Sequence, residues 1–409
     1  MGYILKQFDT PLLRFSVIEN TAAPELRIEW VNEEKKALLP LDLALSPEGL
    51  SRWIQKRTIP KNRAYVNALL ARCGLSINRP MSIIAVCKGL SLNDSYWVVE
   101  DGFTGTFDQY NLYENRFSRI LGLIAFTGYG SSIRSSLVST PELTTNGMLP
   151  KCWRRIDGKV KLYKGGTSGA SNAGEVALPN FQFGKASLTP QGQTVDFQIG
   201  NLKTTPSEPY SEYYAAQVAE AMGINAIHYG LAKWKGQLCS TCELFTSRDM
   251  SFMPVGRLVT HGGFAAVKAF YEEQGPEYLQ ALRDMVVFDA VIYNTDRHFG
   301  NFGFLIDNAT NKIVAPAPLF DHGNSLFNFA GAEFMSSPEK LQEYADTLLP
   351  RAYEDYVEMA CAMMNDRNRE QLRHLLTFRF KRHSHYNLPR EWMGLIEGQL
   401  HKRVGTILH

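Results

Sequence analysis

Two short stretches of the sequence place oxygen-bearing side chains directly beside apolar runs. The first, NTDRHFGN at 294–301, follows the apolar run that ends at Tyr293, and the second, FDHGNS, begins at Phe320 where another apolar run ends. Nothing in the packing of such runs requires Asp296, Asn301 or Asp321 at their ends. Hard divalent cations such as Mg²⁺ take oxygen ligands, often few from protein and the rest from phosphates and water. These residue types therefore suggest a site for a metal and phosphate groups.

The elements around these residues should bring them together. FGFLID (302–307) is typical of a strand, NATN (308–311) of a turn, and KIVAPAPLF (312–320) of a returning strand. A hairpin brings its two ends side by side. We therefore expect Asn301, before the outgoing strand, to lie beside Asp321, after the returning one.

Phosphoryl transfer is the reaction that uses this arrangement. In kinases one aspartate accepts the proton of the substrate hydroxyl, while an asparagine and a second aspartate hold the metal that spans the nucleotide phosphates. Asp296 and Asn301 have the D-x-x-x-x-N spacing of kinase catalytic loops, and Asp321 opens a D-x-G. Two other interpretations stay open. These residues could serve only as turn and cap residues, or Asp296, His298, Asp321 and His322 could form the mixed metal site of a hydrolase that needs no ATP.

A kinase also needs a lysine on a strand of a smaller, β-rich lobe. WRRIDGKVKLYKGG (153–166) predicts a hairpin that turns at Asp157-Gly158. Lys164 ends the apolar part of the second strand, and Lys161 faces the opposite side of it because side chains alternate along a strand. Lys164 is therefore the candidate that contacts phosphates.

The acidic partner of that lysine is expected on a helix. SEYYAAQVAEAMGI (211–224) has one apolar stripe, with Ser211 as its predicted N-cap and Gly223 as its stop signal. Glu212, in its first turn, is the candidate partner of Lys164.

Two loops complete the predicted nucleotide site. TTNGMLPKCW (144–153) is a candidate phosphate-covering loop, with Thr145, Asn146 and Gly147 near its start. CELFTS (242–247) lies where a hinge between two lobes would be, and backbone groups of 243–245 could pair with an adenine edge, with Leu244 or Phe245 packing on the ring.

The order of these motifs resembles that of the HipA-like serine/threonine kinases of bacteria. TTNGMLPK, KLYKGG, SEYYAAQVAEAMGI, CELFTS, NTDRHFGNFGFL and PLFDHGNSL follow one another as in that family, and the D-R-H-x-x-N form is also similar to the phosphatidylinositol kinases. The resemblance covers residues 140–330 best. It implies a two-lobed kinase fold that uses ATP and Mg²⁺ to phosphorylate a protein hydroxyl.

The resemblance also implies a role for each residue. Asp296 would be the base, Asn301 and Asp321 the metal ligands, Lys164 the contact to phosphates, His298 a structural residue of the catalytic loop next to the nucleotide, and Glu243, Leu244 and Phe245 the adenine hinge. HipA-like proteins can autophosphorylate a serine of the phosphate loop. Here the loop offers Thr144 and Thr145, with Ser139 upstream.

The fold class expected is α+β, with an N-terminal accessory subdomain (1–135), a β-rich kinase N-lobe (136–245) and a helical C-lobe (246–409). In the accessory part, 50–75 predicts two short helices broken at Pro60, MSIIAVCKGL (81–90) predicts a strand, and the Gly- and Ser-rich 123–143 predicts a boundary. An antitoxin-like or DNA-associated partner fits this organisation.

Composition sets the remaining bounds. Hydrophobic residues make up 44% and charged residues 21%, which is ordinary for a globular chain, and the net charge of +2 favours no class of partner. Six scattered cysteines favour a reducing cytoplasm, and no signal-peptide region or membrane-length apolar run is present. A non-enzymatic alternative is a kinase-like regulator that binds ATP without transfer.

Three further patterns are given structural interpretations. Gly169 and Gly174 have P-loop spacing but lack the required Lys and Ser/Thr, so this segment is expected to be a loop without a phosphate role. The pair Cys239 and Cys242 has no partner pair for zinc and is expected to be two buried or half-buried thiols. The basic stretch 378–386 and the basic cluster Lys56, Arg57, Lys61 and Arg63 are expected to be solvated faces.

Overall fold

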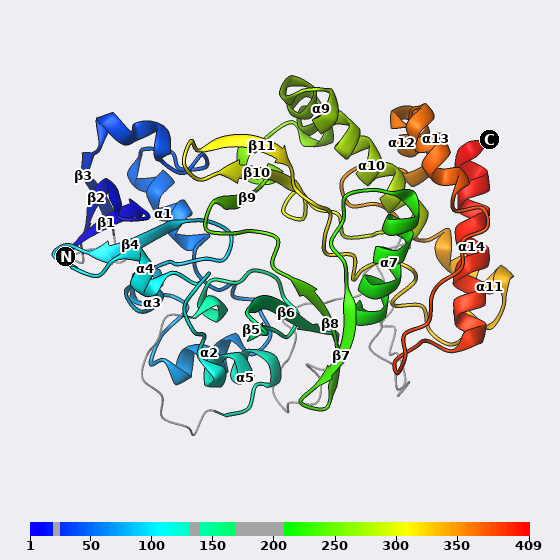
Figure 1. The fold of residues 1–409 in the computed structure, drawn as a ribbon, viewed down its shortest axis with the longest axis horizontal. Helices are drawn as coiled ribbons and strands as arrows, with labels where there is room; N and C mark the ends of the chain where they lie inside the picture. The colour runs from blue at the N-terminus through cyan, green and yellow to red at the C-terminus, as the bar shows by residue number, and fades with distance from the viewer. Residues whose placement is uncertain (19–24, 131–139, 168–207) are drawn as a thin grey trace, which may run out of the picture.

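The computed structural model describes residues 1–18, 25–130, 140–167 and 208–409. Within these ranges the chain forms three antiparallel sheets and an array of helices, so the fold is α+β. Figure 1 shows an elongated molecule. The N-terminal four-stranded sheet lies at one end, the helices after α10 lie at the other, and the other two sheets lie between them.

The N-terminal module contains a four-stranded sheet in the order β3-β2-β1-β4 and short helices, of which α5 packs against the second sheet and α2 packs on α5. Its core contains the fully buried Leu5, Phe15 and Leu50 together with Trp53. The two short helices predicted around Pro60 are confirmed. The elements are β1 (Gly2–Gln7), β2 (Thr10–Ile18), β3 (Glu25–Val31), the 3-10 helix η1 (Glu33–Leu38), α1 (Pro47–Gln55), α2 (Val66–Arg72), α3 (Pro80–Cys87), β4 (Tyr96–Glu100), α4 (Phe107–Tyr110), α5 (Arg119–Thr127) and η2 (Pro141–Leu143).

The strand expected over 81–90 is wrong, because helix α3 occupies this segment. Pro80 stands in the first turn, where its missing N–H leaves no helical hydrogen bond unmade. Ile83, Ile84 and Cys87 are buried, at a spacing that places them on one helix face. A short apolar run does not by itself distinguish a strand from a buried helix. The Gly- and Ser-rich part of the expected boundary, 131–139, lies outside the described residues.

The second sheet has the order β5-β6-β8-β7 and lies in the lower middle of Figure 1. Its strands are β5 (Lys151–Ile156), β6 (Lys159–Gly165), β7 (Gly230–Trp234) and β8 (Gln237–Glu243). The predicted hairpin turn is confirmed: Asp157 and Gly158 both have positive φ, 51° and 77°, as a two-residue type I′ turn requires. The alternation on β6 is confirmed as well, since Lys164 is buried while Lys161 pairs with Glu243 at the surface.

Helix α7 (Glu208–Met222) links this sheet to the helical part of the molecule. Ser211 lies inside the helix, so the prediction that it is the N-cap is wrong; the helix includes residues 208–210, which the apolar stripe alone did not reveal. Gly223 follows the helix with a φ of 65°, as its predicted stop. Tyr214, Val218 and Met222 pack into the large apolar cluster of the C-terminal part.

The third sheet carries the predicted hairpin. Its strands are β9 (Met250–Pro254), β10 (Gly303–Asp307) and β11 (Lys312–Pro316), in the order β11-β10-β9. Gly303 is needed here because a Cβ on it would lie 2.1 Å from the backbone oxygen of Met253. The hairpin turn contacts the N-terminal module: Gln7 Nε2 donates to the backbone oxygen of Asn308 at 2.8 Å, and Asn311 Nδ2 donates to that of Leu39 at 2.7 Å.

The C-terminal part is helical, as expected, and its core is centred on α10. From Met285 to Ile292 every residue of this helix is buried. The elements are α8 (Val255–Leu258), α9 (Gly263–Gln274), α10 (Pro276–Ile292), the 3-10 helix η3 (Phe334–Ser336), α11 (Pro338–Ala345), α12 (Tyr356–Met363), α13 (Asp366–Arg373) and α14 (Arg390–Leu408). None of the described helices combines the length and apolar character that a bilayer crossing needs. The domain boundaries at 135 and 245 stay predictions.

Candidate active site

The loop after α10 is organised by a buried ion pair. Arg297 bonds Asp289 of α10 through two contacts, Nε to Oδ2 at 2.8 Å and Nη2 to Oδ1 at 2.9 Å. Asn294 Nδ2 also donates to Asp289, and all three side chains are buried. A buried pair is tolerated when further hydrogen bonds satisfy its remaining groups. The pair therefore fixes the path of 294–301 against the helix core.

The same guanidinium joins the two ends of the hairpin. Arg297 Nη1 donates to the backbone oxygen of Asn301 at 3.3 Å and to that of Phe320 at 2.6 Å. One residue precedes the outgoing strand and the other follows the returning strand. The expectation that the ends of the hairpin meet is thus confirmed at the level of the backbone.

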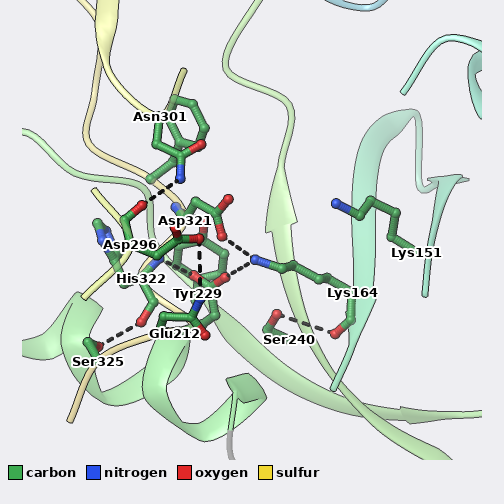
Figure 2. A network of polar contacts seen from close by, with 12 residues as sticks. Lys151, Lys164, Glu212, Tyr229, Ser240, Asp296, Asn301, Asp321, His322 and Ser325 are labelled. Carbon is green, nitrogen blue, oxygen red and sulfur yellow. Dashed lines mark hydrogen bonds and ion pairs between the residues drawn. The ribbon is translucent and has the colours of Figure 1, made fainter. Parts of the chain in front are cut away.

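Asp296 lies on this loop and opens onto a cavity. Its backbone N–H donates to Asn294 Oδ1, and its carboxylate accepts from Asn324 Nδ2 at 3.2 Å and forms an ion pair with Arg351. Asn301 Nδ2 donates to the backbone oxygen of Asp296 at 3.4 Å. Figure 2 shows Asp296, Asn301 and Asp321 on the side of the site opposite Lys164.

Lys164 extends from β6 to two carboxylates (Figure 2). Its Nζ is 2.6 Å from Glu212 Oε1 of α7, and it also pairs with Asp321 Oδ1. Glu212 Oε2 accepts the backbone N–H of His322 at 3.0 Å. Glu212 therefore links the sheet lysine to the segment that carries Asp321, as the sequence predicted for the lysine–glutamate pair.

The charges in this group alter each other's pKa. Burial disfavours the charged ammonium of Lys164, but the carboxylates of Asp321 and Glu212 outweigh it and raise its pKa. Burial would raise the pKa of Asp321, yet the nearby charges of Lys164 and Lys151 hold that pKa well below its usual range. At neutral pH the lysine is a cation and Asp321 an anion.

Tyr229 positions the backbone of Asp321. Asp321 adopts the left-handed region, with a φ of 60°, which costs free energy for a residue other than glycine. Its N–H donates to the hydroxyl oxygen of Tyr229 at 3.0 Å. His322, the next residue, is fully buried and its Nδ1 lies 3.0 Å from Arg297 Nη2. These contacts hold the Asp321 carboxylate in place in front of Lys164.

A cavity of about 310 Å³ lies between these groups, a volume suited to a small ligand. Of the predicted site residues, Gly147, Lys164, Asp296, His298 and Asp321 line it. Its other lining residues lie between positions 62 and 351: Asn62, Ala64, Met148, Leu149, Pro150, Lys151, Thr167, Glu208, Gly323, Asn324, Phe329 and Arg351.

The comparisons with known proteins bear on the fold. No family model and no curated protein sequence matches the chain. Among solved structures, HipA of Shewanella oneidensis MR-1, solved with HipB and operator DNA, is 12% identical; the match covers 99% of each chain with a TM-score of 0.52. The chain has a HipA-like fold. The Helicobacter pylori proinflammatory kinase CtkA is 16% identical, with 63% of this chain and 91% of that chain covered and a TM-score of 0.43.

In this HipA-like fold the segment 144–151 adjoins the cavity. Lys151 Nζ donates to the backbone oxygen of Asn146 at 2.9 Å, and a Cβ on Gly147 would lie 2.1 Å from that nitrogen. Gly147 also has a φ of 91°. Burial and the charge of Lys164 lower the pKa of Lys151 to about 7. The loop thus places a second lysine, which the sequence analysis did not single out, next to Lys164.

The hydroxyls of the loop are already engaged. Thr144 Oγ1 donates to the backbone oxygen of Leu90, and Thr145 Oγ1 donates to that of Pro141 while accepting from Trp153 Nε1. Transfer of phosphate to either would require the loop to leave this position. Ser139 and the segment that contains Gly169 and Gly174 lie outside the described residues.

The N-terminal module of the HipA-like fold contacts the same loop. Arg63 donates to the backbone oxygens of Thr145 at 2.9 Å and Lys151 at 2.7 Å, and it pairs with the buried Glu142 at 3.3 Å. The N–H of Ala64 donates to the oxygen of Met148 at 2.8 Å. The accessory part therefore supports the phosphate loop directly. The expectation of a solvated face is wrong for Arg57 and Arg63, because both guanidinium groups are buried against acidic and backbone partners.

The predicted hinge lies beside the cavity lining without being part of it. Glu243 is exposed and pairs with Lys159, and the N–H of Leu244 donates to the oxygen of Val160. Phe245 packs against Phe252 and Phe320. An adenine edge would therefore have to use other backbone groups of the hinge than the N–H of Leu244.

The donor set fits a magnesium ion, whereas the mixed His/Asp site of the hydrolase alternative is not formed. In the part of the chain that the structure describes, no three His, Cys, Asp or Glu side chains are grouped as a metal site. Magnesium needs fewer protein ligands. Asn301 uses its amide nitrogen on the backbone oxygen of Asp296, which leaves its Oδ1 for a cation. Lys164 bonds Oδ1 of Asp321, which leaves the other carboxylate oxygen of Asp321 for the same cation. Cys239 and Cys242 are buried and half-buried free thiols, as predicted.

Proposed function

We propose that this protein is an ATP- and Mg²⁺-dependent kinase that transfers the γ-phosphate to a serine or threonine hydroxyl of a protein. The observation that carries the proposal is the contact of Lys164 with both Glu212 and Asp321, on one cavity with Asp296. Kinases require this lysine–glutamate pair, a metal aspartate and a catalytic-loop aspartate together. The HipA-like fold supports the same conclusion.

Each residue has a defined task in the proposed reaction. Lys164 would contact the phosphates as a cation held in position by Glu212. Asn301 and Asp321 would hold Mg²⁺, which, when bound, would neutralise charge on the phosphate oxygens. Asp296 would orient the acceptor hydroxyl and take its proton as the new oxygen–phosphorus bond forms. The bond between the γ-phosphorus and the bridging oxygen breaks, and ADP leaves with that oxygen.

Labelled ATP tests this proposal. Pure protein incubated with Mg²⁺ and γ-labelled ATP should transfer label to protein, and mass spectrometry should locate it on serine or threonine. Asp296→Ala should abolish transfer and leave nucleotide binding largely intact. Asp346→Ala, at an exposed position of the C-terminal part, is the control and should transfer at the wild-type rate. Unchanged transfer by the Asp296 variant would contradict the assigned role.

Two alternatives are separated by the same assay. Label recovered in lipid, after vesicles containing phosphatidylinositol are added, would indicate a lipid kinase. Tight nucleotide binding without any transfer would indicate an ATP-binding regulator. The intact set Asp296, Asn301 and Asp321 favours transfer, because binding alone does not need a proton acceptor.

The proposal includes a partner and a compartment. HipA of Shewanella oneidensis was solved with HipB and operator DNA, and we propose an antitoxin-like or DNA-associated partner for this chain by the likeness of the fold. All six cysteines are free thiols, as in proteins of a reducing compartment, and we propose that the protein acts in the cytoplasm.

A further inference from the structure

The carboxylate proposed as the catalytic base is held by an arginine that the sequence analysis did not single out. Arg351 forms an ion pair with Asp296 Oδ1, while Asn324 Nδ2 donates to Asp296 Oδ2 at 3.2 Å. Both oxygens are therefore engaged. Each oxygen keeps a second lone pair. A hydroxyl that approaches Oδ1 nevertheless meets the guanidinium there, so full access to this oxygen requires Arg351 to move aside.

Arg351 is the partner that can give way at little cost. Its side chain is 58% exposed, and that of Asp296 is 27% exposed, so water screens the pair. Asn324, in contrast, is tied to its surroundings: its side-chain oxygen accepts from Asn328 Nδ2 and its backbone oxygen accepts the N–H of Thr295. The guanidinium can move into solvent or to another anion without disturbing the backbone around the site.

The ion pair places Arg351 beside the residue that would receive the acceptor hydroxyl. It lines the cavity with Asp296, His298, Asn324 and Phe329, whereas Lys151 and Lys164 come from the strands beside the phosphate loop. When Arg351 leaves Asp296 it becomes a cation without a counter-charge at the point where an acceptor enters. A second cation brought by the acceptor would be repelled there, and an anion would be attracted.

We propose that Arg351 makes this kinase selective for acceptors that carry a carboxylate next to the hydroxyl. The acidic side chain of the acceptor pairs with the guanidinium, which bonds Asp296 through Nη1 alone, and the incoming hydroxyl then displaces the guanidinium from Asp296. This displacement frees Asp296 Oδ1 for the hydroxyl proton. This inference rests on the proposed kinase function.

A binding measurement tests the selectivity without any turnover. Three labelled peptides differ only in the residues flanking a central alanine, which stands in for the serine: glutamate, glutamine or lysine. Fluorescence anisotropy with a non-hydrolysable ATP analogue and Mg²⁺ gives each Kd. The wild type should bind the glutamate peptide about fivefold more tightly than the glutamine peptide, as one exposed ion pair of about 1 kcal/mol allows. The lysine peptide should bind most weakly.

Variants assign the selectivity to one residue. Arg351→Gln should abolish the preference for glutamate, and Arg351→Glu should reverse it in favour of lysine. Arg373→Gln is the matched control, because Arg373 is 57% exposed and also forms an exposed ion pair, with Glu370. The control should keep the wild-type order of the three peptides.

Phosphate transfer to the corresponding serine peptides then distinguishes failure of the Arg351 role from failure of the kinase function. If label is transferred and the glutamate peptide is not preferred in kcat/KM or in Kd, the role of Arg351 is wrong while the kinase function stands. If no peptide is phosphorylated but the Kd order depends on Arg351, the function is wrong and the acidic recognition stands. Equal Kd values for the three alanine peptides, or no binding of any, overturn the inference.

Discussion

Replacing Lys164 by methionine should reveal how the buried charges of the site depend on each other. Methionine keeps most of the length and apolar stem of the lysine but removes its charge. The side chain of Glu212 is only 1% exposed and pairs with Lys164 at 2.6 Å, so the substitution leaves a buried carboxylate without its cation. Asp321 loses the same partner but lies partly open to the cavity.

The expected loss of stability follows from that burial. Removing one partner of a buried ion pair costs about 3–5 kcal/mol of unfolding free energy, because the other charge stays desolvated. Adding Glu212→Gln should recover at least about half of this loss, since an amide carries no charge and its oxygen can still accept the N–H of His322. Phosphate transfer should stay down by about 10²- to 10³-fold in both variants, as for the loss of one electrostatic catalytic group.

Urea unfolding and the transfer assay, measured on the same preparations, give both quantities. The control is Lys161→Met on the same strand, where the lysine faces solvent and pairs with Glu243 at 3.5 Å. It should change the unfolding free energy by less than about 0.5 kcal/mol and leave transfer unaltered. A double variant no more stable than Lys164→Met alone would refute the electrostatic argument. A double variant that transfers phosphate at the wild-type rate would refute the role of Lys164.

Three further outcomes follow from the site. Tyr229→Phe leaves the N–H of Asp321 without its acceptor and should cost about 1–3 kcal/mol of unfolding free energy. It should also weaken Mg²⁺-dependent nucleotide binding in a thermal-shift titration. Equal thermal shifts for the wild type and the variant would contradict this. Nucleotide binding should take up a fraction of a proton at about pH 8, because phosphate charge raises the pKa of Lys151 from about 7. The ATP phosphates no longer titrate at this pH. Calorimetry in buffers of different ionisation enthalpy measures the proton uptake, and Lys151→Met should abolish this uptake. The native pKa of Asp321 lies below its unfolded value, so its contribution to stability is present at neutral pH and is lost as pH falls below about 4 toward the native pKa. Urea midpoints measured between neutral and acid pH should therefore fall less steeply with pH for Asp321→Asn than for the wild type.

The parts of the site that the sequence predicted are those fixed by local structure. A hairpin brings its ends together whatever surrounds it, so the approach of the backbones at Asn301 and Phe320, which share Arg297, followed from two apolar runs and a turn. The alternation of side chains along β6 separated Lys164 from Lys161, and the position of Lys164 after Leu162 and Tyr163 was enough to choose it as the buried one. The partner of that lysine, Glu212, followed from the position of one helix.

The parts that were missed depend on contacts between distant segments. Arg351 lies 55 residues from Asp296 in the sequence and in no recognisable motif. Arg63 reaches the phosphate loop from the N-terminal module. Arg297 could have been found, because Asp289 interrupts the apolar run of α10, and a buried aspartate needs a cationic or hydrogen-bonding partner nearby. Helix α3 was taken for a strand because its run is too short to show a helical period.

We propose above all that Asn301 and Asp321 coordinate one magnesium ion between the hairpin ends and the phosphates. A crystal structure with a non-hydrolysable ATP analogue and Mg²⁺ tests it most directly. We expect Asn301 Oδ1 and an oxygen of Asp321 at about 2.0–2.1 Å from the ion, with the phosphates beside Lys164. An ion bound elsewhere, or a nucleotide outside the cavity lined by Lys164 and Asp296, would contradict the account.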